Sequence, residues 1–178
     1  GFRCVHYGAE HVSEMSESRR RALINDAMRA DMDNAVLCWL ATVDADGVPN
    51  VTPKEIFAAH GDDTILIADI ASTNSVRNLS AHPKVCVSFV DVFRQKGFKV
   101  VGTARLVAPN DADFTQMSAP LRILTGGAFP IRHVIAVGVE KVSRIWAPSY
   151  SLFPERSEEE LMDAAYRTYG VRPEPDVP

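Results

Sequence analysis

Residues 71–75, Ala-Ser-Thr-Asn-Ser, place four small hydrogen-bonding side chains where a strand passes into a helix. Residues 64–70 before them are mostly apolar, and residues 76–81 after them are typical of a helix that Pro83 ends. One serine or threonine is enough to cap a helix, for about 1 kcal/mol. Backbone N–H groups at a helix start, with hydroxyls beside them, also bind phosphate. The stretch therefore predicts either a helix cap or an anion site.

Lysines on separate segments supply the positive charge that an anion site needs. Lys54 lies in the strand-like run Thr-Pro-Lys-Glu-Ile-Phe at 52–57, and Lys96 and Lys99 lie in a basic turn that runs into a strand at 94–106. Each lysine taken singly is typical of a solvated side chain. Together with the start of the helix they favour an anion site.

Other chemistries lack their motifs in this sequence. It has no HExxH or CxxC metal motif, no GxSxG nucleophile motif and no Walker loop. Cys4, His6 and His11 lie close together, but in a segment without periodicity, and we expect no metal site there. His133 stands at the start of an expected strand, where a histidine is more often structural than a general base. Catalytic side chains are therefore left unassigned.

The composition restricts the class of protein. The chain has 178 residues, 46% of them hydrophobic, which suggests one domain with a sizeable core. A net charge of −4 argues against a nucleic-acid binder. No apolar run approaches the roughly 20 residues that span a membrane, and the first residues lack the apolar core of a signal peptide. Three scattered cysteines fit a reduced, cytoplasmic protein.

Short elements joined by tight turns are expected along most of the chain. Asp46-Gly47 supplies a hairpin turn, and Ser157 with Glu160 forms a capping box that starts a last helix. We expect residues 1–15 to be loosely ordered, helices at 16–32, 110–122 and 157–170, and a barrel over 36–146 with strands at 36–43, 48–57, 64–70, 84–92 and 98–107 and one within 133–146. Because most connections are two to five residues long, an antiparallel barrel is favoured over a parallel sheet.

Three segments resemble the pyridoxamine 5'-phosphate oxidase-like family of FMN-binding split barrels. They are ATVDADGVPNVTP at 41–53, SVRNLSAHPKVCVSF at 75–89 and QKGFKVVGTARL at 95–106. The resemblance covers about 70 central residues. It implies a mainly β fold with flanking helices, a six-stranded antiparallel split β-barrel, and a homodimer with FMN at the subunit interface.

The resemblance also implies a set of cofactor-binding residues. Thr52, Pro53 and Lys54 would lie on the strand that lines the flavin, and Ala68 and Asp69 would approach the ring or ribityl chain. The phosphate would be bound at the helix start by Thr73, Asn74 and Ser75, with Asn78 one turn further on. The remaining residues would complete the site, often from the partner chain: Gln95, Lys96 and Lys99. Lys54 is the first candidate, and Lys99 the second, for the charge beside the flavin ring.

The sequence departs from the true pyridoxamine phosphate oxidases in two places. Thr73-Asn74-Ser75 replaces their Ser-Arg-Lys, and VRPEPDVP replaces their final Arg-Leu-Ala-Pro. We therefore expect an FMN-dependent oxidoreductase of unknown substrate rather than an enzyme acting on pyridoxine phosphate. Two alternatives stay open: a flavin-binding protein for storage or sensing, without turnover, and the same barrel holding haem or a deazaflavin.

Overall fold

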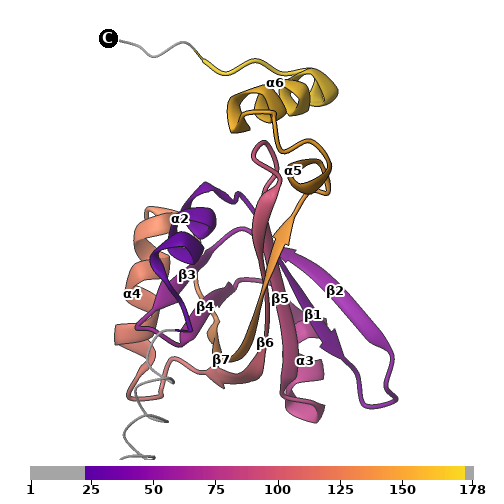
Figure 1. Ribbon diagram of the computed structural model, residues 1–178. Helices are drawn as coiled ribbons and strands as arrows, with labels where there is room; N and C mark the ends of the chain where they lie inside the picture. Colours follow the sequence, from indigo (N-terminus) through magenta and orange to yellow (C-terminus); the bar gives the residue numbers. More distant parts are fainter. Residues whose placement is uncertain (1–22, 175–178) are drawn as a thin grey trace, which may run out of the picture.

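The computed structural model describes residues 23–174, which build an antiparallel sheet that curls into a half-barrel (Figure 1). Its strands are β1 (Cys38–Val43), β2 (Pro49–Lys54), β3 (Phe57–His60), β4 (Thr64–Asp69), β5 (Lys84–Asp91), β6 (Lys96–Val107) and β7 (His133–Trp146). They lie in the order β2-β1-β5-β6-β7-β4-β3, and all neighbours are antiparallel. The expected split-barrel architecture is confirmed.

The sheet has seven strands, so the expected count of six is wrong. The single strand expected at 48–57 is broken at Glu55 and Ile56 into β2 and β3, which stand at opposite edges of the sheet. Pro49 and Pro53 lie in the edge strand β2, as their missing N–H groups require. Because β2 leads straight into β3, the chain itself links the two edges of the curled sheet.

Helices cover the barrel and extend beyond it: α2 (Asp26–Asn34), α3 (Thr73–Ala81), α4 (Phe114–Thr125), α5 (Ser149–Leu152) and α6 (Glu158–Tyr169). The helix expected at 16–32 differs in its described part, because α2 begins only at Asp26. Asn25 is its N-cap and accepts a hydrogen bond from the Met28 N–H at 2.9 Å. Residues 1–22 lie outside the described residues. Within residues 23–174, no helix is both long and apolar enough to cross a membrane.

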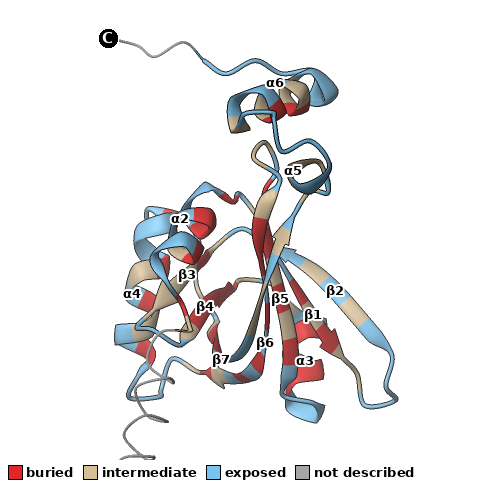
Figure 2. Ribbon diagram, viewed as in Figure 1, coloured by how far each residue is buried: buried red, intermediate tan, exposed pale blue. Residues whose placement is uncertain are grey.

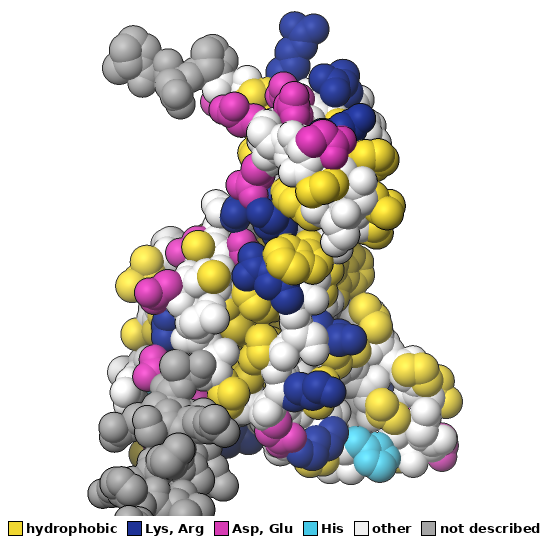
Figure 3. Space-filling model, in the orientation of Figure 1, with side chains coloured by type: hydrophobic (Ala, Val, Ile, Leu, Met, Phe, Trp, Pro, Cys, Tyr) yellow, Lys and Arg dark blue, Asp and Glu magenta, His cyan; other side chains and the backbone are white. Residues whose placement is uncertain are grey.

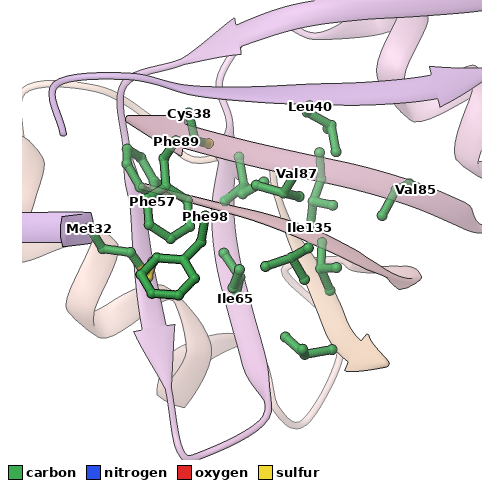
Figure 4. Close-up of a cluster of buried hydrophobic side chains, with 14 of the residues drawn as sticks. Met32, Cys38, Leu40, Phe57, Ile65, Val85, Val87, Phe89, Phe98 and Ile135 are labelled. Atoms are coloured by element: carbon green, nitrogen blue, oxygen red, sulfur yellow. The ribbon is translucent and has the colours of Figure 1, made fainter. Parts of the chain in front are cut away.

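The core lies inside the curl of the sheet, beneath α2 (Figure 2). Alternate residues of β5 face inward, and the Phe89 ring lies between the rings of Phe57 and Phe98, with centroids 6.2 and 6.1 Å apart (Figure 4). Met28 and Met32 of α2 belong to the same cluster. The buried face fixes which side chains of β1, β2 and β5 face outward.

The C-terminal helices stand away from the half-barrel and meet it at the turn between β5 and β6 (Figure 1). Phe93 of that turn packs on Tyr166 of α6, with ring centroids 4.7 Å apart. Arg94 contacts Glu158 and the buried Asp31 of α2, each at 3.0 Å. The expected capping box of Ser157 and Glu160 is present at the start of α6. Figure 3 shows hydrophobic and basic side chains exposed on the face below these helices.

Candidate functional site

The start of α3 lies against the end of β2, and the side chain of the residue before α3 does not cap the helix. Ser72 occupies the N-cap position, but its side chain makes no capping hydrogen bond. Its hydroxyl instead accepts a hydrogen bond from the Lys54 ammonium. The Ser72 N–H donates to Oδ1 of Asp69 at 2.8 Å, which ties the end of β4 to the start of the helix. The first N–H groups of α3 are therefore left without a side-chain cap.

Ser75, the third residue of α3, has a buried hydroxyl with no hydrogen-bond partner among the described residues. Its residue is only 1% exposed. A buried polar group left unpaired costs about 1–3 kcal/mol, so this hydroxyl calls for a partner other than the described residues. The residue Ser75 lines a small cavity of about 250 Å³, together with the following residues: Thr52, Ala71, Ser72, Thr73 and Asn74.

A larger cavity of about 450 Å³ adjoins the first, because Thr52, Ala71 and Ser72 line both. Most of its other lining residues are apolar: Leu37, Pro53, Ile56, Ala68, Ile70 and Phe129, with Lys54 and Glu55. The volume lies in the ordinary range for small-molecule sites, and an apolar wall with one cation suits a flat organic ring that carries polar edges.

Lys54 is the cation that lines the larger cavity, and it bonds to Ser72, which lines both cavities. It is 6% exposed, and burial lowers the pKa of its ammonium, while the nearby Asp69 acts in the opposite direction. An ammonium has three N–H donors, and Ser72 is its one hydrogen-bond partner among the described residues. Two donors thus remain for a ligand.

Asp69 is itself 3% exposed and is held by its own partners. Besides the Ser72 N–H, its Oδ2 lies 3.0 Å from Nδ1 of His133, the residue opposite it on β7. Asp69 therefore does not need Lys54 as a direct ion-pair partner. Its carboxylate holds the backbone N–H of Ser72, a residue that lines the smaller cavity.

Most of the sequence-predicted site residues come together here. The two cavities are lined by Thr52, Pro53, Lys54, Ala68, Thr73, Asn74 and Ser75. Asp69 lines neither cavity but accepts the Ser72 N–H. Asn78 is turned away: its side-chain amide donates to Thr42 Oγ1 at 3.0 Å, and it lines a different cavity between α3 and the β1–β2 hairpin.

Gln95, Lys96 and Lys99 do not line either cavity of this protomer. Gln95 lies in the β5–β6 turn with a φ of 53°, a conformation that residues other than glycine rarely adopt. Lys96 pairs with Glu158 and lies 4.3 Å from the ring centroid of Tyr150. Lys99 is exposed on the outer face of β6. Their part in a cofactor site stays a prediction.

Sequence reasoning did not assign three contributions to this site. The Asp69–His133 contact joins residues 64 positions apart, so only strand pairing reveals it. Phe129 reaches the larger cavity from the loop between α4 and β7, and no local sequence pattern indicates where that loop lies. Ser72 was a candidate cap and turns out to be the partner of a lysine.

The chain is similar to several solved structures and to one protein-family model. No curated protein matches the chain. HupZ of Group A Streptococcus is 26% identical, with a TM-score of 0.60 over 68% of this chain and 94% of that one. An FMN-binding protein of Syntrophomonas wolfei (19%, TM-score 0.57, 76% and 92%) and General Stress Protein 26 of Bacillus anthracis (14%, 0.53, 66% and 90%) are similar in fold. Residues 24–146 match the family described as pyridoxamine 5'-phosphate oxidase. Because that match spans more than half of the chain, the protein belongs to the pyridoxamine 5'-phosphate oxidase family.

Proposed function

We propose that this protein binds FMN and acts as an FMN-dependent oxidoreductase. The phosphate would lie at the start of α3 and the isoalloxazine ring in the larger adjoining cavity. The observation that carries the proposal is the buried hydroxyl of Ser75, which has no partner within residues 23–174, in a residue that lines a small cavity adjoining an apolar one. A ligand with a phosphate at one end and a flat ring at the other matches this pair of cavities.

The phosphate end fits by its donors. Thr73 and Ser75 carry hydroxyls, the uncapped start of α3 offers backbone N–H groups, and Lys54 brings a positive charge. Hydroxyls and free N–H groups at a helix start are the usual ligands of a phosphate dianion. The Ser-Arg-Lys of the true pyridoxamine phosphate oxidases is absent here, so neutral donors and one lysine take over its role.

The ring end fits by its walls and its single cation. Apolar side chains exclude water from a bound ring, and the buried Lys54 ammonium stabilises negative charge that develops on it. FMN, when bound, supplies hydride or electron transfer. The described residues contribute binding, orientation and charge at this site.

We also propose that the protein is a homodimer, and the outer face of the sheet supports this. Strand pairing places Trp39 beside Pro53, and Cys86 between Ala41 and Val101, on one side of β2, β1, β5 and β6. The large apolar side chains exposed on this side are Trp39, Val51 and Val101. Lys99 stands in the same row as Trp39, across Ser88. A second copy covering this face would meet Lys99, as expected of a residue that acts across the interface.

The proposal is tested by titrating the purified protein with FMN, riboflavin, haem and a deazaflavin, followed by absorbance and fluorescence. We expect FMN to bind more tightly than riboflavin, because the phosphate adds charge-assisted hydrogen bonds of about 1.5–3 kcal/mol each. Preference for haem or the deazaflavin would overturn the choice of FMN. Reduction of the bound FMN by NADH or NADPH, with reoxidation by an added acceptor, tests turnover; FMN that binds but stays oxidised with both donors would leave a storage or sensing protein.

A further inference from the structure

Phe129 is an aromatic side chain that folding does not explain. It is 56% exposed, yet it lines the larger cavity beside Pro53, Ile56 and Ile70. An exposed phenylalanine gains little from the hydrophobic effect, because most of its ring stays in water. At this apolar cavity its ring is accessible to a molecule bound there.

The loop that carries Phe129 is fixed at both ends. Gly126 ends α4 with a φ of 57°, and its N–H donates to Ile123 O at 3.2 Å. The Gly127 N–H donates to Arg122 O at 3.3 Å, and Gly127 has a φ of 78°, which glycine adopts without strain. Two residues after Pro130, the Arg132 N–H donates to the Asp69 carbonyl at 2.9 Å. Phe129 thus lies between two anchored points.

Asp69 connects this loop with the smaller cavity at the start of α3. Its carbonyl holds the Arg132 N–H, and its carboxylate holds the Ser72 N–H at the start of α3. Asp69 is nearly inaccessible to solvent, so both contacts are shielded from water. Asp69 therefore holds both the loop that carries Phe129 and the helix start that carries Ser75. This fixes the spacing between the two ends of a ligand.

We propose that Phe129 packs against the planar ring of the bound ligand and is a specificity residue for the ring end of the site. This inference rests on the proposed function. Aromatic side chains and flat heteroaromatic rings attract each other beyond simple burial of apolar area, and every such ring offers a face. Phe129 accordingly selects for a flat aromatic ring, while Thr73 and Ser75 select for the phosphate attached to it.

The first experiment compares Phe129→Ala and Phe129→Leu with the wild type for binding of FMN and riboflavin. Phe129→Ala should weaken both ligands by the same factor, about 5- to 150-fold, because the two share the ring. Phe129→Leu keeps apolar area without an aromatic face and should lie between. Since the side chain is exposed, the melting temperature should stay close to that of the wild type. A loss confined to FMN, or no loss for either flavin, overturns the inference.

The second experiment reads contact directly. Tryptophan in contact with a flavin quenches its fluorescence by electron transfer, so Phe129→Trp should shorten the fluorescence lifetime of bound FMN. Ile123→Trp is the matched control: Ile123 is exposed on α4 and lines neither cavity of the site. Equal lifetimes in the two variants would contradict the inference. Failure of the wild type to bind either flavin would instead refute the proposed function, and the inference with it.

Discussion

Replacing Lys54 with methionine removes the one buried cation of the site and keeps most of its apolar stem. Two of the three N–H donors of the ammonium have no partner among the described residues, and Ser72 takes the third. A ligand can therefore receive one or two charge-assisted hydrogen bonds from Lys54. One such bond contributes about 1.5–3 kcal/mol, so Lys54→Met should weaken FMN about 10- to 150-fold.

Riboflavin lacks the phosphate, so its affinity distinguishes whether Lys54 contacts the phosphate or the ring. If the ammonium contacts the phosphate, riboflavin affinity should be unchanged by Lys54→Met. If it stabilises the reduced ring, both flavins weaken and the two-electron potential becomes more negative, by about 30–65 mV for 1.5–3 kcal/mol. Lys84→Met is the control, because Lys84 is exposed, pairs with Glu140 and lies outside both cavities.

The same variant changes how stability depends on pH. Burial lowers the pKa of Lys54 from its ordinary 10.5, so between the lowered pKa and 10.5 the unfolded chain binds more protons than the folded protein. The free energy of unfolding of the ligand-free wild type therefore rises with pH through this window. Lys54→Met lacks this contribution, and its stability relative to the wild type should fall as pH rises toward 10.5. Urea unfolding at several pH values measures the difference.

Unchanged affinity for FMN together with an unchanged potential in Lys54→Met would show that Lys54 contacts neither the phosphate nor the ring. The charge beside the flavin would then come from Lys96 or Lys99. A stability difference that does not depend on pH would separately show that the ammonium is not desolvated in the folded protein.

Three further predictions concern assembly and folding. The protein should sediment as a dimer of twice the 19.5 kDa chain, and Trp39→Glu, which puts a charge on the apolar outer face, should shift it to monomers; a wild-type monomer at micromolar concentration would exclude the interface. Ser157→Ala removes one half of the capping box and should lower the free energy of unfolding in urea by about 0.5–2 kcal/mol. FMN affinity should be unchanged because α6 lies away from both cavities, and a large loss of affinity would place α6 over the ligand. Gly102→Ala should destabilise the fold by about 1–3 kcal/mol or more, since its Cβ would overlap the carbonyl oxygen of Gly138, whereas Gly138→Ala meets its nearest atom at 3.6 Å and serves as control; equal melting temperatures for the two variants would contradict this packing.

Local patterns were enough to predict most of the elements. The Asp46-Gly47 turn, the apolar run at 64–70 and the Ser157–Glu160 box act over a few residues, and each appears in the structure. The break at Glu55 and Ile56 was not predicted, because it arises only from the curl of the whole sheet. The curl places the two halves of this run, β2 and β3, at opposite edges. The start of α2 was missed because Asn25, rather than an upstream residue, caps it.

The site was predictable where its residues are adjacent in sequence. Thr73, Asn74 and Ser75 follow a strand directly, so their common place at a helix start could be inferred. The contacts of Asp69 with His133, and the approach of Phe129, depend on how β4 pairs with β7 and where the loop after α4 returns. Such contacts join residues that no local pattern connects.

The most direct test of the central claim is a comparison of FMN and riboflavin in the double variant Thr73→Ala/Ser75→Ala, with Ser80→Ala as a control on the exposed side of α3. If these hydroxyls hold the FMN phosphate, the double variant should weaken FMN on the order of 10²- to 10⁴-fold and riboflavin far less, because riboflavin has the same ring without the phosphate. Ser80→Ala should change neither. Equal losses for the two flavins, or no loss for either, would contradict a phosphate site at the start of α3.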